Sequence, residues 1–91
     1  MSSEITFNEK ESRYEQDHDG HIVYANSHRK EDTVYIDYVY APPELRGKGA
    51  ASKFMHGLMA LIRTENLKAV PICGFAATWL TRHSEYDDLK S

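Results

Sequence analysis

The residues with the clearest chemical potential lie in one short stretch, APPELRGKGAA, at positions 41–51. Arg46 and Lys48 are cations there. Gly47 and Gly49 alternate with them and have no Cβ that would keep a ligand away from the main chain. Because the start of a helix exposes backbone N–H groups and about half a positive charge, we expect this stretch to hold an anion such as a pyrophosphate.

Two better-known phosphate motifs fit this stretch less well. A nucleotide P-loop requires Gly-Lys followed by Ser or Thr, whereas Lys48 is followed by Gly49. A dinucleotide fingerprint requires a third glycine where this chain has Ser52, and it does not follow a series of antiparallel strands. The remaining alternative is an ordinary strand-to-helix turn without a ligand.

The residues before this stretch predict the strand that positions it. Residues 33–40, TVYIDYVY, are almost all β-branched or aromatic, and both faces are largely apolar, which indicates a central strand. Alternation places Val34, Ile36, Tyr38 and Tyr40 on one face and Tyr35, Asp37 and Val39 on the other. Pro42 and Pro43 then end the strand, because neither can donate a hydrogen bond.

The residues after the stretch predict a long helix. Apolar side chains recur at helical spacing from about residue 49 to 66, and Asn66 is suited to close the helix in a left-handed conformation. Gly57 lies within this helix at a cost of about 1 kcal/mol relative to alanine, which indicates a close neighbour.

The other segments complete an α+β fold. We expect two short strand pieces within residues 4–16, a strand at 21–29, a short strand at 67–73 and a short helix at 75–83, followed by a polar end. Pro71 places the strand at 67–73 at a sheet edge or beside a bulge, because proline cannot donate a hydrogen bond. The order predicts a mixed, mostly antiparallel sheet whose last strand runs parallel to residues 33–40.

Size and charge limit the class of protein. Ninety-one residues, of which 41% are hydrophobic, suffice for a single domain, 1–91, with one core. The net charge of −3 is concentrated in residues 1–20, and residues 44–68 are basic, which favours a small anionic ligand over nucleic acid. One cysteine excludes an internal disulfide, and no apolar run is long enough to cross a membrane. We therefore expect a cytoplasmic monomer or weak dimer with no nucleic-acid or membrane partner.

The stretch PPELRGKGAASKFM resembles the pyrophosphate-binding motif of the GNAT superfamily of acetyl-CoA-dependent N-acetyltransferases. That motif is Gln or Arg, two residues, Gly, one residue, and Gly or Ala, and Arg46, Gly49 and Ala51 occupy its three fixed positions. The segment VPICGFAATWLTRHSEYDDL resembles the small single-domain branch, in which a Cys-containing strand end precedes a short helix and a His-x-Glu-Tyr tail. The resemblance extends over about residues 20–89.

The resemblance implies that acetyl-CoA binds where strand 33–40 separates from strand 68–73. It places the pyrophosphate on the backbone of Arg46, Gly47, Lys48, Gly49, Ala50 and Ala51, and the pantetheine arm along Val39, Tyr40 and Ala41. It also implies a GNAT-like sheet with a long helix after the Gly-rich loop and a short C-terminal helix.

Acetyl transfer requires a neutral amine, stabilisation of the thioester oxygen and a proton for the departing thiolate. Cys73 matches a cysteine regarded as an active-site residue in the small branch, either as a general acid or as a nucleophile; its alternative is an inert thiol. Tyr38 stands where branch members commonly carry histidine, and it could protonate the thiolate or simply fill the core. Asp37 is a charge in an apolar strand that could activate the amine through water or pair with a basic side chain.

Three functions remain open from the sequence. The first is transfer of an acetyl group from acetyl-CoA to an unidentified amine of a small molecule or peptide, by a direct route without a covalent intermediate. The second is non-catalytic binding of CoA or acyl-CoA, and the third is an interaction module whose Gly-rich turn is only structural. The five histidines have no recognised zinc or calcium spacing, so we expect no metal.

Overall fold

The computed structural model describes residues 4–91 as one five-stranded sheet with two α-helices. The strands are β1 (Thr6–Asn8), β2 (Arg13–His18), β3 (His21–Lys30), β4 (Thr33–Tyr40) and β5 (Lys68–Pro71). The helices are α1 (Ala50–Thr64) and α2 (Gly74–Thr81), with 3-10 turns at Pro43–Leu45 and Ser84–Leu89. Strand order is β1-β2-β3-β4-β5, antiparallel except for the parallel β4–β5 pair, which confirms the predicted mixed sheet.

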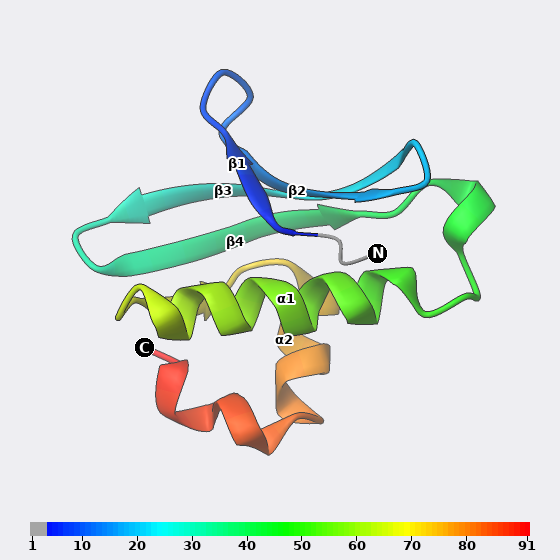
Figure 1. Ribbon diagram of the computed structural model, residues 1–91. Coiled ribbons are helices and arrows are strands. Elements are labelled where there is room, and N and C mark those ends of the chain that lie inside the picture. The colour runs from blue at the N-terminus through cyan, green and yellow to red at the C-terminus, as the bar shows by residue number, and fades with distance from the viewer. Residues whose placement is uncertain (1–3) are drawn as a thin grey trace.

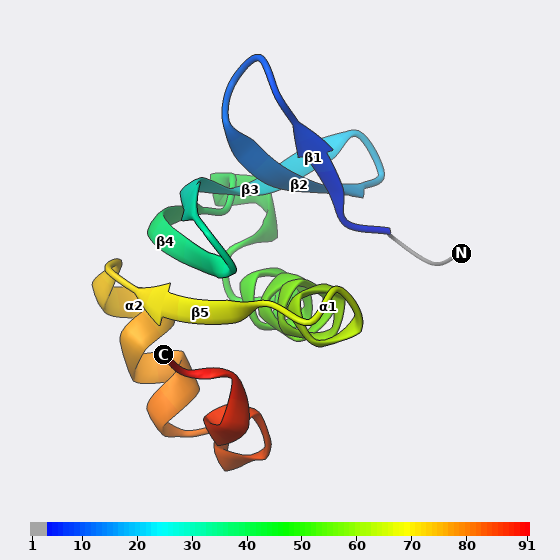
Figure 2. The same cartoon turned by 90° about the vertical axis from the view of Figure 1, so that its left-hand side faces the viewer.

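One face of the sheet is covered by α1, as Figure 1 shows. The view along α1 in Figure 2 shows the sheet curving around this helix, with β5 between β4 and α2. The fully buried side chains of α1 meet those of β3 and β4 here, and they include Phe54, Met55, Leu58, Met59, Ile62, Val23, Val34 and Ile36. This packing anchors the start of α1 against β4.

Gly57 has the close neighbour that its position predicts. A Cβ added there would lie 3.1 Å from Cγ1 of Ile5 and 3.4 Å from Nε2 of Gln16 in β2. The helix therefore approaches the sheet closely at this turn. Asn66 closes α1 with a φ of 59°, the left-handed conformation expected of it.

The prediction for the faces of β4 is wrong beyond Ile36. The pairing with β3 moves from Ser27 opposite Ile36 to Asn26 opposite Tyr38, so Asp37 is an extra residue in a β-bulge. A one-residue insertion reverses the faces of all residues that follow. Val39 consequently packs against the core, whereas Tyr38 is 51% exposed.

The C-terminal segment is more ordered than its polar composition predicts. Residues Ser84–Leu89 form a 3-10 helix, and Leu89 is buried. The guanidinium of Arg63 donates to both carboxylate oxygens of Asp88, at 2.7 and 3.2 Å, and the amine of Lys68 donates to the Asp88 carbonyl at 2.7 Å. Side-chain hydrogen bonds rather than hydrophobic periodicity hold this segment, which is why the sequence pattern missed it.

The bounds of the remaining elements differ from their predictions by a few residues. β5 is shorter than the expected 67–73 and lies at the sheet edge, as Pro71 predicts. β2 continues to His18, two residues beyond the predicted segment 4–16. Among residues 4–91, no helix combines the length and the apolar character required to cross a membrane.

Candidate functional site

The loop between β4 and α1 is shaped by its prolines and glycines. Pro43 begins a single 3-10 turn, which ends at Leu45. Gly47 and Gly49 then have φ values of 82° and 77°, in the left-handed region that side chains disfavour. Gly49 is the N-cap of α1, and no side chain caps the helix. The sequence Gly-x-Gly is thus required by the path of the backbone, and it leaves the helix start uncovered.

The amides of the loop fall into two groups. Those of Arg46 and Lys48 donate to the carbonyls of Pro43 and Leu45, at 3.2 Å in both cases. In the described chain, the amides of Gly47, Gly49, Ala50 and Ala51 have no backbone or side-chain acceptor. The predicted anion cradle therefore has four available donors rather than six.

These available amides border a cavity of about 290 Å³. Its walls come from Ala41, the loop, the first turn of α1, and two aromatic residues of α2. Trp79 is buried, and its Nε1 donates to Oγ of Ser52 at 2.9 Å. Phe75 is 43% exposed and lines this cavity.

β4 and β5 separate beside this cavity. Their pairing ends at Ile36 opposite Pro71, and the amides of Ile72 and Cys73 then both donate to the Ile36 carbonyl, at 2.9 Å each. Within the described residues, β4 continues to Tyr40 without β5 beside it. The opening lies where the sequence analysis expects the two strands to diverge.

The three predicted catalytic residues surround this opening. Cys73 is the N-cap of α2 and is partly buried against the core, two residues beyond the end of β5. Asp37 is the bulged residue of β4, next to Ile36, whose carbonyl binds the Cys73 amide. The backbone thus joins Asp37 and Cys73 through one hydrogen-bonded residue. Tyr38 follows Asp37 and is exposed, so it does not fill the core.

The residues predicted to lie along the pantetheine arm have different surroundings. Val39 and Ala41 pack against the core. The ring of Tyr40 stacks on Tyr24 with 5.2 Å between centroids, and the guanidinium of Arg46 lies 5.6 Å from the Tyr40 ring. Arg46 Nε also donates to the Ala41 carbonyl at 2.9 Å, which ties the loop to the end of β4.

The structure adds His28, a residue that the sequence analysis considered only as a metal ligand. Its Nδ1 lies 2.8 Å from Oδ2 of Asp37, and its ring stacks on Tyr35 with centroids 4.7 Å apart and planes 3° apart. An ionised carboxylate only accepts hydrogen bonds, so Nδ1 donates and Nε2 is left as the acceptor. The short interval between the predicted strands 21–29 and 33–40 was the available signal, because a hairpin there places His28 beside the second strand.

The histidine of the C-terminal helix has a structural role. Nδ1 of His83 lies 2.7 Å from the Trp79 carbonyl, so the side chain bonds to the C-terminal end of α2. The His83 ring also stacks on Trp79, 3.8 Å between centroids. These contacts fix Trp79, which in turn lines the loop cavity.

Comparisons with known proteins agree with this architecture. A sequence model of the family described as GCN5-related N-acetyl-transferase matches residues 9–89. The fold is similar to the NMR solution structure of a GCN5-like candidate N-acetyltransferase from Staphylococcus aureus, with a TM-score of 0.71 and 24% sequence identity. That match covers 100% of this chain and 91% of the other. Among curated proteins there is no match.

Proposed function

Since the chain belongs to the GCN5-related N-acetyltransferase family, we propose that it transfers the acetyl group of acetyl-CoA directly to the nitrogen of an amine. The observation that carries the proposal is the uncovered start of α1, where the amides of Gly47, Gly49, Ala50 and Ala51 have no partner among residues 4–91 and border a cavity. The acceptor is a primary amine of a small molecule or a peptide.

The loop fits a pyrophosphate in three respects. The amides of Gly47, Gly49, Ala50 and Ala51 supply donors, and the dipole of a 15-residue helix favours negative charge at its start. A Cβ at either glycine would meet no atom within 4 Å, so the space in front of the main chain is open. The terminal nitrogens of Arg46 remain available because only its Nε is bonded to Ala41.

Acetyl-CoA supplies an activated acyl thioester, and the residues of this chain act on the amine and the thiolate. Nε2 of His28 accepts the proton of the acceptor ammonium, while Asp37 holds the His28 ring in the required tautomer. The nitrogen lone pair then forms the C–N bond and the C–S bond breaks. Tyr38 or Cys73 gives a proton to the departing sulfur, with Tyr38 favoured by its exposure. That side chain regains a proton from the new amide nitrogen, which loses its second proton as the amide forms.

Two measurements test the proposal. Calorimetry with acetyl-CoA and with CoA tests binding, and a free-thiol assay across a panel of amines tests turnover. We expect binding of both nucleotides and amine-dependent thiol release. Binding without release from any amine would leave a CoA-binding protein, and absence of binding would leave an interaction module.

A further inference from the structure

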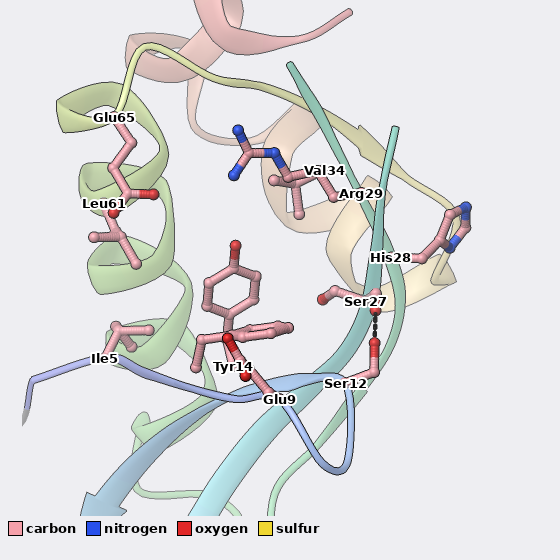
Figure 3. A pocket seen from close by; sticks show the side chains of 11 residues that line it. Ile5, Glu9, Ser12, Tyr14, Ser27, His28, Arg29, Val34, Leu61 and Glu65 are labelled. Atoms are coloured by element: carbon pink, nitrogen blue, oxygen red, sulfur yellow. Dashed lines mark hydrogen bonds between the residues drawn. The ribbon is translucent and has the colours of Figure 1, made fainter. Parts of the chain in front are cut away.

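A second cavity, of about 420 Å³, opens at the other end of α1 and shares no lining residue with the loop cavity. Figure 3 shows it enclosed by the last turns of α1, by β3, and by the chain around β1. The apolar part of its lining comes from Ile5, Phe7, Tyr14, Val34 and Leu61, and the rest of the lining is polar or charged. A volume of several hundred Å³ is typical of sites for small molecules.

One polar group at this cavity, the hydroxyl of Tyr14, has no hydrogen-bond partner among the described residues. Tyr14 is only 7% exposed, and its ring packs against Phe7 with centroids 4.8 Å apart. Figure 3 shows its hydroxyl pointing into the cavity, and it makes no hydrogen bond to any residue from 4 to 91. The hydroxyl is therefore a donor that a ligand in the cavity can use.

Two opposite charges lie beyond this hydroxyl. Figure 3 shows the Tyr14 oxygen pointing toward the space between the carboxylate of Glu65 and the guanidinium of Arg29. Nε of Arg29 donates to the Glu31 carbonyl at 3.1 Å, which leaves its two terminal nitrogens available. In the described part of the chain, Glu65 forms no ion pair, with Arg29 or with any other cation.

Both charges act on the hydroxyl. Burial raises the pKa of Tyr14, the negative charge of Glu65 raises it further, and the positive charge of Arg29 lowers it. The cavity thus presents a carboxylate (Glu65), a guanidinium (Arg29) and a neutral hydroxyl (Tyr14), together with apolar side chains.

We propose that this second cavity binds a small zwitterion with an apolar side chain, the chemical class of free leucine and phenylalanine. The ligand ammonium pairs with Glu65, and its carboxylate accepts hydrogen bonds from Arg29 and from the Tyr14 hydroxyl. The side chain fills the space between Ile5 and Leu61. The second cavity shares no residue with the cavity proposed to bind acetyl-CoA, although His28, the proposed base, is part of its lining.

The test is a titration of the full chain followed by backbone amide NMR, with L-phenylalanine and L-leucine as probes. Phenethylamine lacks the carboxylate, and 3-phenylpropionate lacks the ammonium. We expect saturable shifts around Tyr14, Arg29 and Glu65 with the amino acids, and at least about tenfold weaker binding of either analogue. Equal binding of all the aromatic probes contradicts the zwitterion, and no shift up to about 10 mM contradicts the site.

Matched variants locate the interaction. Tyr14→Phe keeps the ring and removes the hydroxyl, and Arg29→Gln and Glu65→Gln each remove one charge. We expect each to weaken L-phenylalanine binding by about five- to tenfold, whereas Lys30→Gln, at the exposed end of β3, leaves it unchanged. Acetyl-CoA affinity should be unaffected in all four, so failure here is distinguishable from failure of the transferase proposal. Unchanged amino-acid binding in Tyr14→Phe and Arg29→Gln overturns the assignment.

Discussion

The two ends of α1 differ in whether their polar groups are hydrogen-bonded within the protein. At the start of the helix, four backbone amides have no acceptor within the described residues. At its other end, the guanidinium of Arg63 bonds to both carboxylate oxygens of Asp88 and to the Glu85 carbonyl, at 3.0 Å for the latter. Polar groups paired within the protein hold the chain together, whereas unpaired ones lower the free energy of the complex with a ligand. This difference supports the proposal that the start of α1 binds the pyrophosphate of acetyl-CoA.

The largest effect is expected when a negative charge is added at the start of α1, because it should abolish most of the affinity for acetyl-CoA. Ala51→Glu places a carboxylate in the first turn, where it suits the helix dipole but repels a pyrophosphate. We expect acetyl-CoA affinity, measured by calorimetry, to fall by about a hundredfold or more with no loss of thermal stability.

The matched control is Ala60→Glu, the same substitution at an exposed position farther along the same helix. It should leave acetyl-CoA affinity within about twofold of the original protein. If both substitutions weaken binding equally, the ligand responds to net charge and not to the helix start.

The second prediction concerns the base. His28→Ala removes the group held by Asp37 and should lower kcat by about a hundredfold, with little change in KM for acetyl-CoA. Added imidazole should restore part of the rate. His21→Ala, at the opposite end of β3, serves as the control and should keep its activity. An unchanged kcat in His28→Ala would remove this residue from the mechanism.

A third substitution separates the roles open to Cys73. Direct transfer requires no acyl-cysteine, so Cys73→Ser should lower kcat by no more than about tenfold. Mass spectrometry of the original protein mixed with acetyl-CoA alone should show no acetylated Cys73. An acetylated thiol that disappears when an amine is added would instead establish a covalent route.

The smallest effect is expected at the paired end of α1. The hydrogen bonds from Arg63 lower the pKa of Asp88 below its ordinary value of 3.8. Because the pKa is lower in the folded state, the pair stabilises the protein fully above the ordinary pKa of 3.8. This contribution is lost as the pH falls through the lowered pKa of the folded state. Both side chains are exposed, so the effect is small.

Asp88→Asn should therefore lower the midpoint of thermal unfolding slightly at pH 7 and leave it unchanged near pH 2. Acetyl-CoA affinity should not change at pH 7. A loss of affinity equal to that of Ala51→Glu would show that the two ends of α1 are not separate in function.

Local chemistry determined how much of this fold was predictable. Pro71 predicted an edge strand, Asn66 a left-handed helix end, and the Gly-rich loop an uncovered helix start, because each depends on the residue's own backbone. The bulge at Asp37 was missed, because it depends on the register between two strands. Missing it placed Tyr38 on the wrong face.

The site was predictable only in part for the same reason. The loop residues are contiguous in the sequence, so their spacing was visible. The contact between His28 and Asp37 joins two strands and appears only when the hairpin register is known. The second cavity also requires the fold, since Tyr14 and Glu65 are far apart in the chain.

The central claim is that the unpaired amides at the start of α1 bind the pyrophosphate of acetyl-CoA, and amide NMR during a titration with CoA tests it most directly. The claim predicts that the largest shifts occur at Gly47, Gly49, Ala50 and Ala51 and that these amides become protected from hydrogen exchange. Saturable binding that leaves these four amides unshifted would contradict it.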